Sequence, residues 1–422
     1  MRKWILLAAC ALAAQACFTV ILEEETSATE DLPDYLKPSG DIIVVTGLAY
    51  PEGVDWTASG LDNPGARLVM YMDKELKVNL STDASEGVAC TDPYLHFFSG
   101  GQLYSAFLSD GSSTLARNGV KMLQLEGRKY LLAVREDSLT VRTLWENEGG
   151  RGFVSLEGGE KVFENQEGSI YKNIGANELG ELCFFYSVPV KSSSGMLTQY
   201  HCVCGKENIQ MDLPRELVNI FGFIRSPDGF KVLCRNEGNR MNYEMYDTST
   251  GSSMLLFPPW DGQLTALSND TPALFHACLT RPTGKVWNVI QIDGLHAVEW
   301  DGDDYALGFI RTGDGTAGIL KSRTGEDRDL LIRGKLCDSL PSGYTVLTDK
   351  AVNISYDGYA RIGLSSKTGG RALLWSEGKI DTLGFRGVVT GVYTLEREEE
   401  PAQESIRTTW PTDGRDHIFT PR

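Results

Sequence analysis

Two copies of a Trp-Asp-Gly triplet carry the residue types best suited to binding a ligand. The triplets begin at Trp260 and at Trp300, 40 residues apart, each after a strand-like run. An indole ring can stack on a sugar or anchor a protein partner, and the aspartate beside it can accept hydrogen bonds. The alternative is that each tryptophan is wedged between neighbouring sheets. We predict Trp260, Asp261, Trp300 and Asp301 as ligand-binding residues.

Residues for nucleophilic or metal-assisted catalysis do not gather in any recognised pattern. The five histidines are scattered, and His201-Cys202-Val-Cys204 is the one segment that combines histidine with two thiols. Side chains alternate along a strand, so His201 would point away from Cys202 and Cys204, and the three would not converge on zinc. The sequence has no G-x-S-x-G nucleophile turn and no phosphate-binding glycine loop. No catalytic residue is predicted, and the sequence leans towards a non-enzymatic protein.

One N-terminal segment points to calcium instead. Residues 51–56 (PEGVDW), followed by residues 67–73 (RLVMYMD), resemble the opening of the calcium-dependent lactonase propellers. This resemblance implies that Glu52 is a metal ligand, and that a calcium-dependent hydrolase, lactonase-like or carbohydrate-active, is the alternative function. The later asparagine ligand of that family is not matched, because Phe223-Ile-Arg225 occupies its place. Apart from calcium, no cofactor is predicted.

A recurring turn indicates the elements that must position these residues. It reads Ser226-Pro-Asp228-Gly229, Ser268-Asn-Asp270-Thr271, Thr312-Gly-Asp314-Gly315 and Ser355-Tyr-Asp357-Gly358, so its aspartates are spaced by 42, 44 and 43 residues. An Asp or Ser side chain can accept backbone N–H groups one or two residues on, and Gly tolerates positive φ. Apolar runs flank each turn, and a period in the forties that contains strands indicates a β-propeller.

Weaker copies of the turn extend the repeat towards the N-terminus. Glu52, Asp92, Asp137 and Gly180 lie near the same register, which gives eight anchors. We therefore predict an all-β fold, a propeller of eight four-stranded blades, or of seven if one unit only closes the ring. Residues 41–47 (DIIVVTG) and 387–393 (GVVTGVY) are the predicted closing strands, since propellers pair their two termini to remove free sheet edges.

One repeat unit resembles a known class of propeller. Residues 226–235 (SPDGFKVLCR), with residues 242–247 (NYEMYD) after them, are similar to the repeats of TolB-like and WD40-like bacterial propellers. That resemblance implies binding of protein more often than catalysis. Because many unrelated functions share the motif, it indicates the fold rather than the ligand.

Charge and cysteine content limit which binding partners and which cell compartment fit this protein. The 422 residues carry a formal charge of −17 with a pI near 4.8, which would repel phosphates and excludes a nucleic-acid partner. Cys202 and Cys204 share a face of one predicted strand, where either can meet Cys183 of the neighbouring strand in a disulfide. Cys183, Cys234 and Cys278 otherwise fit the role of small core residues.

The N-terminus has the pattern of an export signal. Met1-Arg-Lys3 precedes an apolar run over residues 4–16, and Ala14-Gln-Ala16 is a cleavage site directly before Cys17. The segment resembles a bacterial lipobox, which implies lipidation of Cys17, although alanine replaces the usual leucine. An uncleaved membrane anchor is the remaining alternative. The predicted organisation is a signal peptide over 1–17, a tether over 18–40, the propeller over 41–395 and a charged, flexible tail over 396–422.

Together these patterns predict an exported, non-enzymatic binding protein or lipoprotein of the bacterial cell envelope. It would lie in the periplasm or at the outer membrane, with a lipid anchor if Cys17 is modified. Its partner is a protein or a glycan, and the sequence does not choose between them.

Overall fold

The structure is a computed structural model that describes residues between Ile42 and Leu395. Within that span the gaps are residues 57–60, 62–64, 83–90, 110, 138, 178, 194, 227, 268–272, 303–304, 313–314, 322–328, 334–335 and 355–359. The predicted signal peptide, tether and tail, with Cys17, lie outside the described residues. No helix in the described part is long and apolar enough to cross a membrane.

Six consecutive antiparallel sheets of four strands make up most of the described chain. Each sheet is one blade, and its four strands are consecutive in the sequence. The blades are β4 (His96–Ser99), β5 (Gln102–Ser109), β6 (Ser112–Arg117) and β7 (Val120–Glu126); β8 (Lys129–Glu136), β9 (Val141–Asn147), β10 (Phe153–Glu157) and β11 (Glu160–Asn165); β12 (Ser169–Ala176), β13 (Leu182–Ser192), β14 (Gly195–Cys204) and β15 (Glu207–Met211); β16 (Leu217–Ser226), β17 (Gly229–Asn236), β18 (Asn242–Asp247) and β19 (Ser252–Phe257); β20 (Asp261–Ala266), β21 (Leu274–Thr280), β22 (Val286–Ile292) and β23 (Leu295–Asp301); and β24 (Tyr305–Thr312), β25 (Gly315–Lys321), β26 (Asp329–Arg333) and β27 (Leu336–Ser339).

The remaining strands form one larger sheet in which both ends of the described chain meet. Its members are β1 (Ile42–Ala49), β2 (Arg67–Met72), β3 (Glu75–Ser81), β28 (Tyr344–Thr345), β29 (Val352–Ile354), β30 (Ala360–Ser366), β31 (Arg371–Ser376) and β32 (Lys379–Leu395). The first half of β32 pairs with β31, up to Arg371↔Arg386, and the second half pairs with β1, from Ala49↔Gly387 to Ile42↔Leu395. Two blades therefore share one long strand.

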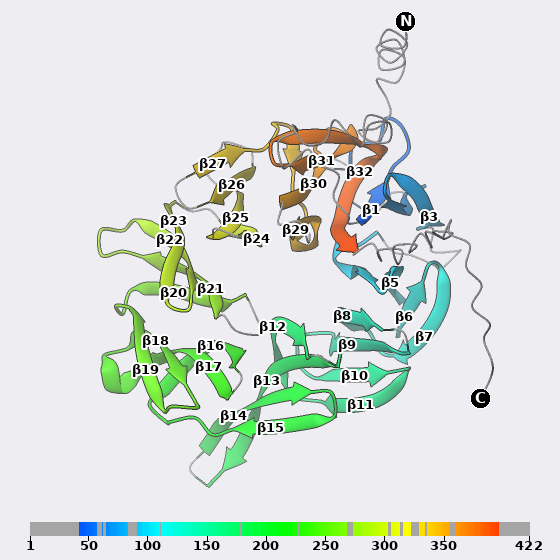
Figure 1. The fold of residues 1–422 in the computed structure, drawn as a ribbon. Coiled ribbons are helices and arrows are strands. Elements are labelled where there is room, and N and C mark those ends of the chain that lie inside the picture. Colours follow the sequence, from blue (N-terminus) through cyan, green and yellow to red (C-terminus); the bar gives the residue numbers. More distant parts are fainter. Residues whose placement is uncertain are drawn as a thin grey trace, which may run out of the picture.

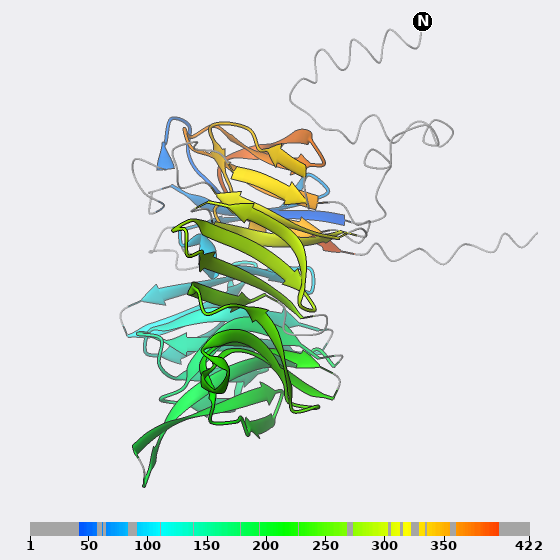
Figure 2. The same ribbon diagram turned by 90° about the vertical axis from the view of Figure 1, so that its left-hand side faces the viewer.

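Figures 1 and 2 show the sheets arranged around a common centre, with β32 beside β1 where the ring closes. The predicted all-β propeller is confirmed, and the described strands form eight blades rather than seven. The predicted closing strands are also confirmed, because residues 42–47 pair with residues of the second half of β32.

Six of the eight sequence anchors mark the same place in the fold. Asp137 and Gly180, like the four stronger turns, fall between the first and second strands of their blades. Glu52 and Asp92 were wrong as anchors of this turn. Glu52 follows β1, which is the second strand of its blade because β32 supplies the first, and Asp92 caps the short η3 helix (Pro93–Leu95) before β4. Asp270, Asp314 and Asp357 lie outside the described residues.

The hydrophobic core is divided among the contacts between neighbouring blades. Phe185 of β13 stacks on Phe223 of β16 with ring centroids 5.2 Å apart, and Trp145 of β9 is fully buried against the blade before it. Cys183 of β13 stands opposite Cys204 of β14 and forms a disulfide with it. Of the two predicted partners of Cys183, Cys202 and Cys204, the structure has Cys204. Cys234 is buried in the core, as predicted.

Candidate functional site

A cavity of about 340 Å³ opens between the β4–β7 blade and the β8–β11 blade. We call it the interblade pocket. Its walls come from β6 and β7 of the first blade, and from the turns that join β8 to β9 and β10 to β11 in the second. Its lining residues are Leu115, Arg117, Met122, Leu123, Glu136, Asp137, Leu139, Thr140, Val141, Thr143, Gly158 and Gly159. The pocket combines a concavity with several polar groups, which is how binding sites are built.

Glu136 fixes the wall where the two blades meet. The Tyr104 hydroxyl donates a hydrogen bond of 2.7 Å to its Oε2, and Arg117 Nη2 lies 2.7 Å from its Oε1. The Glu136 side chain is largely buried and Tyr104 is fully buried. Burial, and then the hydrogen bond to Glu136, raise the pKa of the Tyr104 hydroxyl, which keeps it protonated as a donor. Two side chains of the β4–β7 blade therefore hold a carboxylate of the β8–β11 blade.

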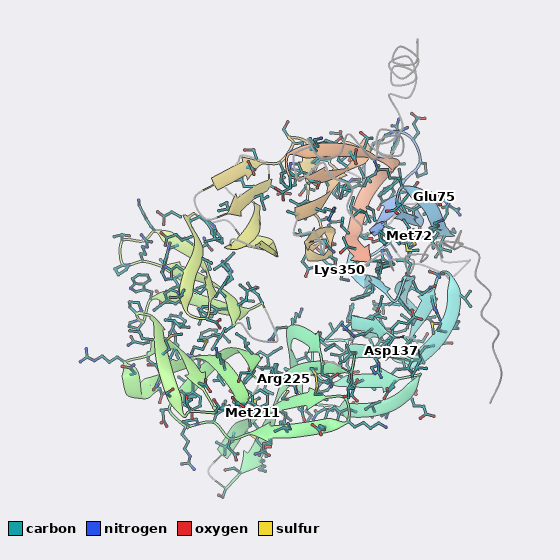
Figure 3. All side chains as sticks on the ribbon, in the orientation of Figure 1. Met72, Glu75, Asp137, Met211, Arg225 and Lys350 are labelled. Carbon is teal, nitrogen blue, oxygen red and sulfur yellow. A yellow bond between two sulfur atoms is a disulfide. The ribbon has the colours of Figure 1, made fainter. Side chains whose placement is uncertain are left out.

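Asp137 builds the turn that forms the neighbouring wall (Figure 3). Its Oδ1 accepts the backbone N–H groups of Leu139 at 2.8 Å and Thr140 at 2.9 Å, and its Oδ2 accepts from the Arg142 guanidinium. Arg142 also lies 2.9 Å from Glu157 Oε1. The hydrogen bond from Arg142, followed by those from the two backbone groups, lowers the pKa of Asp137 to about 2. The Asp137 carboxylate is thus ionised at neutral pH, and both of its oxygens accept hydrogen bonds.

Leu139 gives the pocket its apolar mouth. Its side chain is 94% exposed, although the turn beneath it is held by the Asp137 hydrogen bonds. Met122 of β7 is also exposed, whereas Leu115 of β6 is buried. The charged groups of the pocket are all ion-paired: Arg117 pairs with Glu136, and Asp137 pairs with Arg142 outside the lining. The arrangement is suited to holding an apolar group rather than to proton transfer.

The predicted tryptophan site does not assemble. Trp260 packs edge-on against Trp287, 5.9 Å between centroids, in the contact with the β16–β19 blade. Trp300 stacks on His276 at 5.7 Å and packs towards β26. Trp300 stands opposite Asn288, whose side chain points away from that of Trp287, so the two predicted tryptophans lie on opposite faces of one blade. Both are packed between blades, and their ligand-binding role stays a prediction.

The acidic members of that prediction and the predicted calcium ligand lie at the surface. Asp261 and Asp301 are exposed, and Asp301 Oδ1 is 3.8 Å from Arg281 Nη2. Glu52 is 83% exposed and its Oε1 lies 3.1 Å from Arg386 Nη2. Among the described residues, no three His, Cys, Asp or Glu side chains are grouped as metal ligands would be.

Comparison with known proteins finds solved structures of similar fold and no match by sequence. No family model and no curated protein matches the sequence. Solved β-propeller structures resemble it at low identity. Hsv2 of Kluyvelomyces marxianus is 11% identical, with 66% of this chain and 90% of that chain covered and a TM-score of 0.32. Hydrazine synthase of Kuenenia stuttgartiensis is 11% identical over 76% and 90%, with a TM-score of 0.34. Acylaminoacyl peptidase of Pyrococcus horikoshii is 13% identical over 67% and 50%, with a TM-score of 0.37. These TM-scores are too low to carry any inference about this chain.

Proposed function

We propose that this chain is an exported, non-enzymatic β-propeller that binds a protein of the bacterial cell envelope through the interblade pocket. The observation that carries the proposal is Leu139, an almost fully exposed leucine held by a hydrogen-bonded turn at the mouth of a walled cavity. A partner that covers this side chain buries apolar surface, and because the turn is already held it need not be ordered on binding. A protein is favoured over a glycan because the residues that line the pocket are aliphatic and charged rather than aromatic.

Export is supported by the Cys183–Cys204 disulfide, because disulfides persist mainly in oxidising compartments. It agrees with the basic and apolar N-terminal segment that precedes Cys17. We include lipidation of Cys17 in the proposal, which would place the propeller at a membrane surface in the periplasm or at the outer membrane.

The pocket is tested by affinity capture from detergent-solubilised envelopes of the source bacterium. Leu139→Asp places a charge at the apolar mouth of the pocket. It should reduce the amount of captured protein at least tenfold, because the contact loses its apolar area. Leu295→Asp is the matched control, since Leu295 is also strongly exposed but starts a strand of a distant blade. Equal capture by wild type and Leu139→Asp would contradict the proposal.

A parallel measurement addresses the hydrolase alternative. Purified protein is melted with and without millimolar calcium and is assayed on lactones and aryl glycosides. Turnover that depends on bound calcium and is lost in Glu52→Gln would replace the binding proposal with an enzymatic one.

A further inference from the structure

The hairpin of β13 and β14 is longer than the blade that carries it. Its strands pair over ten residue pairs, from Cys183↔Cys204 to Ser192↔Gly195. β12 accompanies β13 only as far as Ser187, and β15 accompanies β14 only as far as Tyr200. In the described part of the chain, residues 188–192 and 195–199 therefore form a two-stranded ladder flanked by no third strand. Figures 1 and 2 show this projecting hairpin beyond the ends of its neighbours.

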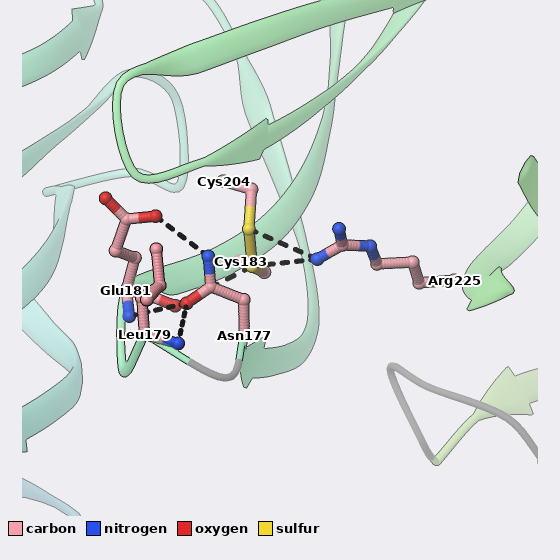
Figure 4. Close-up of a disulfide and its surroundings, with 6 residues drawn as sticks. All are labelled: Asn177, Leu179, Glu181, Cys183, Cys204 and Arg225. Atoms are coloured by element: carbon pink, nitrogen blue, oxygen red, sulfur yellow. Dashed lines mark hydrogen bonds between the residues drawn. A yellow bond between two sulfur atoms is a disulfide. The ribbon is translucent and has the colours of Figure 1, made fainter. Parts of the chain in front are cut away.

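The root of the projecting hairpin is held firmly. The Cys183–Cys204 disulfide links its two strands at the end opposite the tip, and Arg225 from the next blade donates to both sulfurs, at 3.5 and 3.3 Å (Figure 4). Nearer the tip, Tyr186 stacks on His201 with centroids 4.7 Å apart. A hairpin anchored in this way is pre-organised, so a partner that docks on it need not order it first.

The projecting hairpin carries exposed apolar side chains and almost no charge. Met196 is 65% exposed and Leu197 is 53% exposed, and Leu197 stands opposite Val190. Lys191 is the one charged residue between positions 188 and 199, in a chain whose formal charge is −17. Natural proteins usually protect a strand edge with charges, and this edge lacks them.

Pro189 indicates which way the backbone of β14 faces. A proline fits a strand only where its nitrogen points away from the paired strand, because it has no N–H to donate. Pro189 stands opposite Thr198, so the backbone N–H and C=O of Thr198 also point away from the hairpin's own ladder. They face the side on which β15 pairs further along β14. The β15 side of β14 thus offers a row of hydrogen-bonding groups.

We propose that the open edge of β14 over residues 196–199 takes up an extended strand of a partner protein by β-strand addition. The incoming strand has apolar side chains at alternate positions, to pack beside Leu197, and carries a net positive charge. The charge of −17 attracts such a strand and opposes a second copy of the chain, whose charge would be the same. Backbone hydrogen bonds supply affinity in this mode and alternate side chains supply specificity. This surface is independent of the interblade pocket.

The test uses a fluorescein-labelled peptide, acetyl-Lys-Thr-Val-Thr-Val-Thr-Lys-amide, titrated with the full chain and followed by fluorescence anisotropy. Thr198→Pro removes the outward N–H, and Thr198→Val keeps it while changing the side chain. We expect the peptide to bind wild type and Thr198→Val alike and to bind Thr198→Pro at least tenfold more weakly. A peptide with Glu in place of Lys should bind more weakly than the basic one.

A second variant guards against a folding defect in the first. Leu197→Glu changes an exposed side chain, leaves the backbone intact, and should also weaken peptide binding at least tenfold, while thermal melts confirm that both variants fold. Equal binding by Thr198→Pro and wild type, or no binding to wild type, would overturn the proposal. So would a concentration-dependent dimer that Thr198→Pro dissolves, because the occupant would then be a second copy.

Discussion

At the scale of single residues, Asp137 couples the turn before β9 to Arg142. Its folded pKa of about 2 lies below the ordinary value of 3.8, so the ionised carboxylate stabilises the fold above the higher value. That contribution is lost as the pH falls through about 2. Asp137→Asn should therefore lower the melting temperature at pH 7, and the advantage of wild type should shrink between pH 4 and pH 2. Asp228→Asn, in the same turn of another blade, is the control, and an equal effect there would show that Arg142 is not the cause.

Lys350 connects two blades across the strand that closes the ring (Figure 3). Its Nζ donates to the carbonyls of Tyr94 at 2.8 Å and His96 at 2.9 Å, and lies 3.3 Å from the centroid of Phe97. Lys350→Met leaves both carbonyls without this donor. We expect it to lower the free energy of unfolding at pH 7 by about 1–3 kcal/mol, measured by urea denaturation. Lys74→Met removes an exposed ion pair with Asp381 and should cost much less.

The difference in free energy of unfolding between wild type and Lys350→Met should also depend on pH. Burial lowers the pKa of Lys350 to about 8 from its ordinary value of 10.5. Between those two values the unfolded chain binds more protons than the folded one, so this group stabilises the fold increasingly as the pH rises. The gap between wild type and Lys350→Met should widen from pH 7 to pH 10. A constant gap would show that burial of the charge contributes nothing.

At the scale of elements, the sequence predicted the strands well because their signals are local. The runs of β-branched and aromatic residues, and the aspartate turns, act within a few residues of themselves. The Asp92 anchor was wrong because Asp92 caps the η3 helix ahead of β4, the first strand of its blade. The Glu52 anchor was wrong because β32 supplies the first strand of its blade and makes β1 the second, which is a long-range effect. The interblade pocket was missed for the same reason. Arg117 and Glu136 are joined only by the docking of two blades, and Asp137 was seen as a turn residue alone.

The Cys183–Cys204 disulfide is an element-scale prediction that an unfolding experiment can weigh. It links strands that are 21 residues apart in sequence, and cross-links of this kind typically contribute about 2–4 kcal/mol. We expect the free energy of unfolding of the Cys183→Ser, Cys204→Ser double variant, measured by urea denaturation, to be lower than that of wild type by about 2–4 kcal/mol. Reductant should destabilise wild type to the same level and leave the double variant unchanged. An effect of reductant on the double variant would point to another pair of thiols.

At the scale of the whole molecule, stability depends on one strand that joins the two ends of the described chain. The second half of β32 pairs with β1 over eight residue pairs, and without it the first blade would lack its innermost strand. A chain ending at Arg386 should therefore lose cooperative thermal unfolding. A chain ending at Leu395 should melt as the full chain does, because it keeps the whole of β32 and its pairing with β1.

Gly387 allows a gentler test of the same closure. Its φ is 131°, and a Cβ there would lie 2.2 Å from the Leu48 carbonyl oxygen, at the point where β32 passes from one blade to the next. Gly387→Val should lower the melting temperature by more than Gly378→Val, because a Cβ at Gly378 meets nothing, although its φ is also positive. The excess measures the close approach of β32 to β1. If the two variants melt alike, positive φ alone accounts for the loss of stability. The predicted clash between a side chain at position 387 and the Leu48 carbonyl would then be wrong.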